Sequence, residues 1–144
     1  MKVSLFVNHP HAPKIDRRKL SAVVKEVIRE EGKSVDNINV VLVEDDYLLE
    51  VNRKFLKHDY RTDVISFSLE TEGPIDGEVY VSVDRARVQA RRYKIPAVRE
   101  IVRLIVHGVL HLAGWEDGTR AEKLRMRKRE NVFIERFFEA HEVR

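Results

Sequence analysis

The 144-residue chain contains no cysteine, and this absence removes several kinds of chemistry at once. Disulfide scaffolds, thiol nucleophiles, iron–sulfur clusters and cysteine-bound zinc are excluded, so a metal site would need histidine and carboxylate ligands. Long apolar runs are also missing, because the most apolar stretch, residues 101–112, is shorter than the roughly 20 residues that span a bilayer. Near the N-terminus, Lys14 follows too soon for the apolar segment of a signal peptide. We therefore expect a protein with no membrane association that resides in the cytoplasm.

Repeats, low-complexity runs and linkers are equally absent, which predicts one domain over residues 1–144. Hydrophobic residues make up 43% of the chain, enough to build a core in a domain of this length. Lysine and arginine number 27 against 24 aspartates and glutamates, so the formal net charge is only +3. This composition is typical of a soluble globular protein.

Hydrophobic periodicity predicts an α/β fold of the mixed type also described as α+β. Apolar patterns indicate four strands, at residues 3–7, 40–43, 64–67 and 79–83. Helical spacing indicates about five helices: residues 15–32, a helix capped by Asp45, residues 84–93, a helix that Pro96 opens at its first position, and a helix from about residue 120 with a Thr119–Glu122 capping box. A helical connection favours a parallel first pair of strands, and turn residues favour an antiparallel hairpin for the second pair. The prediction is a single domain with a four-stranded mixed sheet.

The helix that follows Pro96 is apolar around most of its circumference and is therefore expected at the centre of the fold. His107 and His111 lie four residues apart in it, so their side chains share one face. Two neutral core histidines, each satisfied by a carbonyl or carboxylate, are one interpretation of this pair. A metal site is the other.

The residues after this helix favour the metal site. Gly114 comes three residues after His111, and Asp117 comes six residues after His111. This is the spacing of metzincin-type sites. There a glycine ends the helix and lets the chain return with a third ligand, so this helix is expected to be zincin-like. His107, His111 and Asp117 would bind one Zn²⁺ per chain and leave a fourth position for water, as catalytic zinc sites do.

The position after the first histidine bears on the reaction. Zinc peptidases keep a glutamate there as general base, whereas this chain has Gly108. A metallopeptidase-like hydrolase therefore lacks its usual proton acceptor. Glu116, in the turn after the helix, is a candidate base, although an acid in a turn is more often simply solvated.

Basic residues cluster between Asp84 and Leu104 and lead directly into the histidine helix. Clustered cations can follow a phosphate backbone, which makes RNA or DNA a candidate substrate. A solvated helix face is the alternative interpretation. The candidates for backbone contacts in this stretch are Arg85, Arg92, Arg99 and Arg103. A second basic run, at residues 125–129, is interleaved with acids and is interpreted as surface.

The segment from His107 to Trp115 resembles the signature of the YbeY-type endoribonucleases, which act in ribosomal RNA maturation. Further blocks match in order: Asn52, Asp59, residues 62–67, Gly77-Glu78 and Gln89-Ala90. The resemblance covers the chain from Val40 to about Phe133. It implies an α/β fold with a zinc-binding helix, cleavage of single-stranded ribosomal RNA precursors, ribosome quality control, and association with the small ribosomal subunit.

Two positions depart from the pattern of this family. Its third metal-binding histidine is replaced by Asp117, which can bind zinc but adds negative charge and so makes the metal a weaker Lewis acid. The family's arginine is replaced by Leu56, and Arg61 is a candidate substitute. Asp63 and Ser66 are expected to shape the wall of the site. An RNA-binding ribosome-assembly factor without robust catalysis stays an alternative.

Overall fold

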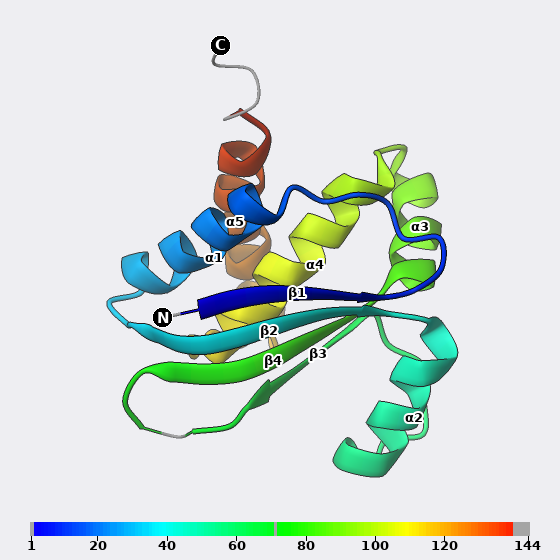
Figure 1. The fold of residues 1–144 in the computed structure, drawn as a ribbon, viewed down its shortest axis with the longest axis horizontal. Helices are drawn as coiled ribbons and strands as arrows, with labels where there is room; N and C mark the ends of the chain where they lie inside the picture. Colours follow the sequence, from blue (N-terminus) through cyan, green and yellow to red (C-terminus); the bar gives the residue numbers. More distant parts are fainter. Residues whose placement is uncertain (1, 71, 140–144) are drawn as a thin grey trace.

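The computed structural model describes residues 2–70 and 72–139, and over these residues the chain forms four strands and five helices (Figure 1). The strands are β1 (Lys2–Asn8), β2 (Val35–Val43), β3 (Val64–Ser68) and β4 (Ile75–Ser82), and the helices are α1 (Arg17–Glu30), α2 (Asp45–Leu56), α3 (Val83–Tyr93), α4 (Ala97–Leu112) and α5 (Arg120–Glu139). All predicted elements are present. The predicted fold class, a domain with a mixed sheet and about five helices, is confirmed.

The sheet has the strand order β1-β2-β4-β3. β1 and β2 pair in parallel, with Leu5 opposite Val40, and β3 and β4 pair antiparallel, with Ser66 opposite Val79. Both pairings confirm the prediction. A second parallel pairing, β2 with β4, joins the two halves and places Val40 beside Val79. β3 therefore lies at one edge of the sheet.

Successive residues of β2 point to opposite faces of the sheet, and each face has its own apolar cluster. Val40 and Leu42 belong to the main core, which α1, α4 and α5 cover. Val41 and Val43 belong to a smaller cluster on the other face, beneath α2. Figure 1 shows the same division, with α2 apart from the other helices. On the main-core face, α4 contacts β3, β4, α1, α3 and α5, so it lies at the centre of the fold, as its apolar circumference predicts.

Three details differ from the predictions. Pro96 is the N-cap of α4 and not its first helical residue. Glu44, without a side-chain hydrogen bond, is the N-cap of α2, because the Asp45 carboxylate instead accepts a hydrogen bond from Ser82 Oγ at 2.9 Å. Phe55, on the predicted apolar stripe of α2, is 61% exposed, since the cluster beneath α2 ends before it.

The predicted Thr119–Glu122 capping box forms, with reciprocal side-chain to backbone bonds of 2.9 and 3.1 Å at the start of α5.

Among residues 2–70 and 72–139, no helix combines the length and apolar character needed to cross a membrane.

Candidate metal centre

The two histidines of α4 face each other across one helical turn. Their rings lie 4.6 Å apart between centroids, and the two Nε2 atoms are separated by 3.0 Å. Elsewhere on its surface, this part of α4 packs tightly on the sheet. A Cβ atom on Gly108 would lie 2.6 Å from Val79 Cγ1 and 2.8 Å from Ser66 Oγ. The glycine in the position of the peptidase glutamate thus permits the close approach of α4 to β3 and β4.

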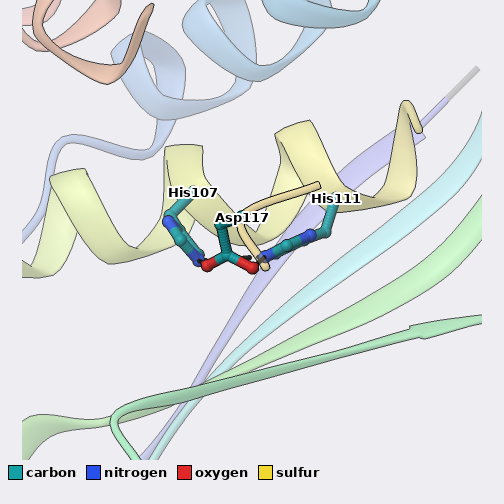
Figure 2. A group of neighbouring side chains, drawn as sticks. All are labelled: His107, His111 and Asp117. Carbon is teal, nitrogen blue, oxygen red and sulfur yellow. Dashed lines mark hydrogen bonds and ion pairs between the residues drawn. The ribbon is translucent and has the colours of Figure 1, made fainter. Parts of the chain in front are cut away.

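A reversal of the chain after α4 brings the third candidate ligand to the histidines. Gly114 adopts a φ of +103°, a conformation that side chains disfavour, and its N–H donates to the carbonyl of His111 at 3.0 Å. Three residues later, Asp117 Oδ2 lies 3.3 Å from His107 Nε2, and Asp117 Oδ1 lies 3.4 Å from His111 Nε2. Figure 2 shows the three side chains pointing toward one another.

The other nitrogen of each ring is already engaged. His107 Nδ1 lies 2.6 Å from Glu130 Oε2, and His111 Nδ1 lies 2.8 Å from the carbonyl oxygen of Trp115. Both partners accept hydrogen bonds, so Nδ1 is the donor on each ring, and in this tautomer the Nε2 lone pair of the imidazole faces Asp117. Lone pairs on two nitrogens and a carboxylate therefore converge, an arrangement that a bound cation stabilises.

The spacing of the two Nε2 atoms and the two Asp117 oxygens fits a metal ion. Their separations of 3.0, 3.3 and 3.4 Å compare with about 3.3 Å between ligand atoms in a tetrahedral site with zinc distances of about 2.0–2.1 Å. Among the described residues, His107, His111 and Asp117 are the group of histidine and acidic side chains that could hold a metal. Hydrogen bonding of Nδ1 to a carboxylate or carbonyl is also the usual arrangement of metal-bound histidines.

A buried chain of charges lies behind His107. Glu130, 1% exposed, accepts from Arg103 Nη1 at 3.1 Å, and Arg103 Nε and Nη2 donate to Glu100, 0% exposed, at 2.9 and 2.5 Å. Burial by itself lowers the pKa of Arg103, but the hydrogen bonds and charges of Glu100 and Glu130 outweigh it and raise the pKa overall. The guanidinium therefore stays charged and pairs with both buried carboxylates.

A cavity of about 250 Å³ opens beside His107 and Asp117. Its walls come from α3, α4, α5 and the residues just before β3. On one wall, Gln89 Nε2 donates to Asp63 Oδ2 at 3.1 Å. On the wall formed by α5, Lys123 Nζ donates to the carbonyl oxygen of Asp117 at 2.8 Å, and Arg127 Nε lies 3.8 Å from Glu130 Oε1. The candidate metal centre is thus open to a substrate from the side of this cavity.

Comparison with known proteins identifies the family. A family model described as Endoribonuclease YbeY matches residues 6–138. A relative named Endoribonuclease YbeY from Flavobacterium psychrophilum is 41% identical over 114 residues, which cover 79% of this chain and 81% of that protein. Another, from Chlorobium phaeobacteroides, is 39% identical over 118 residues, covering 82% and 83%. The chain belongs to the YbeY endoribonuclease family.

A solved structure supports the fold assignment. The solution structure of a Thermotoga maritima protein matches with a TM-score of 0.67, over 98% of this chain and 92% of that chain. The two sequences are 24% identical, so the match shows that the fold is shared. The YbeY family, predicted from the segment between His107 and Trp115, is confirmed by the family model and the curated relatives.

The two predicted catalytic candidates of this YbeY-family chain do not line the cavity beside the candidate metal centre. Glu116 is exposed and lines a different cavity, together with Trp115 and Arg125. Arg61 Nη1 forms ion pairs with Asp45 at 2.7 Å and Asp46 at 2.8 Å at the start of α2. The hydrogen bonds that Arg61 donates to Asp46 and then to Asp45 raise the pKa of Arg61. Leu56 lines a third cavity of about 220 Å³ beside β3.

The predicted RNA contacts are also dispersed. Arg85 Nη2 lies 3.7 Å from Asp45 Oδ2, and Arg99 forms an ion pair with Glu135 on α5. Arg103 is 11% exposed and is occupied by the two buried glutamates. Arg92 is exposed at the end of α3. Of these four arginines, Arg103 is the one that lines the cavity beside His107.

Glu130 was missed because it sits within a run of basic residues that was interpreted as surface. A local signal existed. Met126, Phe133 and Phe137 define the buried stripe of α5, and Glu130 falls on the same stripe, four residues after Met126 and three before Phe133. A charged residue on a buried stripe indicates a partner within the fold. Lys123 and Arg127 were missed because their direction depends on the packing of α5 against α4.

Proposed function

We propose that this protein is a zinc-dependent endoribonuclease that cleaves single-stranded RNA during maturation and quality control of the small ribosomal subunit in the cytoplasm. Membership of the YbeY family supports the endoribonuclease activity. The curated relatives carry the same activity in their names. Zinc, ribosomal RNA precursors and the cytoplasm are the finer parts of the proposal.

The convergence of His107 Nε2, His111 Nε2 and the Asp117 carboxylate supports the metal dependence most directly. Both imidazoles have their Nδ1 atoms hydrogen-bonded to acceptors of the protein, which leaves Nε2 of each ring for a metal ion. Two histidines and one carboxylate are a common ligand set for catalytic zinc. When bound, zinc would act as a Lewis acid toward a phosphodiester oxygen or lower the pKa of water.

The protein's own residues would orient the ligands and the substrate. Glu130 holds His107, and the carbonyl of Trp115 holds His111, so neither ring has to reorganise when the ion enters. Ser66 Oγ donates to the carbonyl of Gly108 at 2.9 Å and ties α4 to the strand that borders the site. The negative charge of Asp117, in place of a third neutral imidazole, should reduce the Lewis acidity of the metal and therefore the rate.

Cleavage of a labelled single-stranded RNA tests this proposal. Wild type, His107→Ala and Asp117→Asn would be assayed with added zinc and with a chelator, while thermal unfolding is followed in parallel. We expect cleavage by wild type with zinc, and a loss in both variants that exceeds the 10- to 100-fold typical of outer-sphere changes. His58→Ala, at an exposed histidine stacked on Tyr60, is the matched control and should keep full activity.

Equal cleavage in every sample would indicate a contaminating nuclease and would contradict the proposal. Cleavage of a peptide but not of RNA would favour a metallopeptidase-like hydrolase instead. A duplex of the same RNA sequence, cleaved as fast as the single strand, would contradict the single-strand preference.

A second function, binding of RNA in ribosome assembly without robust catalysis, is favoured by the departures at Leu56 and Asp117. The two functions make different predictions for His111→Ala. In a purely structural zinc site, this variant would lose stability and zinc, with no cleavage activity to lose in the wild type. In the enzyme, cleavage would be lost under conditions where the variant stays folded.

A further inference from the structure

We infer that Lys123 and Arg127 form a phosphate-binding subsite for the RNA backbone on the α5 wall of the cavity beside the metal centre. This inference rests on the proposed function and specifies where the substrate lies. Neither residue was a predicted RNA contact. The first basic stretch of the chain, residues 85–103, is the alternative location.

Lys123 and Arg127 both lie in the first half of α5. They are separated by four residues, so they share one face of the helix, and both line the cavity that also contains His107 and Asp117. Both are exposed, unlike the neighbouring Met126 and Glu130, which are buried. Their cationic groups are therefore at the surface of the cavity.

The side chains of Lys123 and Arg127 each make a limited contact with the protein. Lys123 Nζ is held beside the centre by its 2.8 Å bond to the carbonyl of Asp117, and this bond uses one of the three N–H donors of the ammonium group. Arg127 Nε lies 3.8 Å from Glu130, which is too long for a hydrogen bond, and Arg127 is 48% exposed. Both groups thus keep hydrogen-bond donors for a phosphate. The planar guanidinium of arginine is suited to bind a phosphate through two parallel hydrogen bonds.

The cavity itself has no excess of charge of either sign. Its lining includes the carboxylates of Asp63, Asp117 and Glu130 and the cations of Arg103, Lys123 and Arg127, so the lining is neutral as a whole. Arg103 is committed to Glu100 and Glu130, which leaves Lys123 and Arg127 as the cations facing outward from this lining. A divalent ion at the centre makes the occupied cavity positive and attractive to a phosphodiester.

The first basic stretch offers a weaker case. Arg99 pairs with Glu135, and Arg103 is buried among glutamates, so each of these two would have to leave a carboxylate in order to bind a phosphate. Arg85, 3.7 Å from Asp45, and the exposed Arg92 do not line the cavity beside the metal centre.

Equilibrium binding tests the inference. The probe is a fluorescent single-stranded oligonucleotide with every 2′-hydroxyl methylated, titrated with zinc-loaded protein at several salt concentrations, and gel analysis verifies that it stays intact. We expect Lys123→Gln combined with Arg127→Gln to weaken binding about tenfold. The slope of log affinity against log salt should fall by about 1.4, because each phosphate contact on a single strand contributes about 0.7.

The matched control combines Arg125→Gln with Lys128→Gln. It removes the same two charges from exposed positions of the same helix, which lie on a different face, and Arg125 lines the neighbouring cavity. Binding and salt slope should stay within twofold of wild type. Arg127→Gln alone leaves the Lys123 bond to Asp117 in place and should reduce the slope by about 0.7. The zinc content of each variant is measured, since a change at Lys123 could otherwise act through the metal.

Equal weakening by the two double variants would overturn the inference in favour of diffuse surface charge. Unchanged binding by the Lys123 and Arg127 double variant would overturn it as well. Failure of the wild-type protein to bind the probe would contradict both the proposed function and the inference. This outcome is seen in the first titration, before any variant is compared.

Discussion

Two stretches of the chain are rich in positive charge but use it differently. In residues 85–103, Arg99 and Arg103 are bound to carboxylates, and Arg103 is almost fully buried. In the first half of α5, Lys123 and Arg127 lie exposed along the cavity beside the candidate metal centre. Arg99 and Arg103, which precede the histidines in the sequence, are thus bound to carboxylates, whereas Lys123 and Arg127, which follow them, border the site.

The difference shows that the density of basic residues does not by itself locate a binding surface. What matters is whether folding brings a carboxylate to each cation. A paired and buried guanidinium contributes to the architecture, and its removal leaves unpaired buried charge. An exposed cation contributes little to stability and keeps its hydrogen-bond donors for a ligand.

The largest effect is expected from removing the buried cation. Arg103→Met leaves Glu100 and Glu130 buried without their partner, so the free energy of unfolding should fall by about 3–5 kcal/mol. Arg127→Met, which removes an exposed guanidinium, should change it by less than about 1 kcal/mol. Urea denaturation followed by circular dichroism measures both. Similar stability of the two variants would remove the basis of the comparison.

A change at Glu130 tests the point where the two stretches meet, because Arg103 and Arg127 both approach this side chain. Glu130→Gln keeps the size of the side chain but weakens its hydrogen bond to His107. Affinity for zinc, measured by competition with a chromophoric chelator, should fall about 10- to 100-fold. Glu135→Gln, at the exposed partner of Arg99 on the same helix, should leave the affinity unchanged. Equal affinities of both variants would assign Glu130 a purely structural role.

The smallest effect is expected at Asp84, which opens the first stretch. Burial raises the pKa of Asp84, but hydrogen bonds from His9 Nε2 and the N–H of Asp45, both 2.8 Å long, outweigh it and hold the pKa below its usual range. A lowered pKa contributes stability that is present above about pH 4 and is lost as the pH falls through the value in the folded state.

Asp84→Asn should therefore reduce stability at neutral pH by no more than about 1 kcal/mol, because the carboxylate is partly exposed. The difference from wild type should shrink as the pH falls below 4. Urea denaturation between pH 3 and 7 measures both trends, with the exposed Asp36→Asn as a control. A difference that stays constant with pH would show that the Asp84 charge plays no part.

Much of the candidate centre could be predicted because it is local. His107, His111 and Asp117 fall within one short segment, and helical periodicity followed by the reversal at Gly114 brings them together. The surrounding residues could be predicted only in part. Glu130 lies on the buried stripe of α5, which indicates a partner, but no pattern in the sequence identifies that partner as His107.

The sequence by itself determined the secondary structure, the mixed sheet and the set of candidate ligands, because each follows from periodicities and turns over a few residues. Only the tertiary structure decided which carboxylate orients His107, which cations line the cavity, and where Glu116 and Arg61 lie. Those outcomes depend on how α3, α4 and α5 pack together, and ion pairs between distant elements form only once that packing has placed their charges side by side.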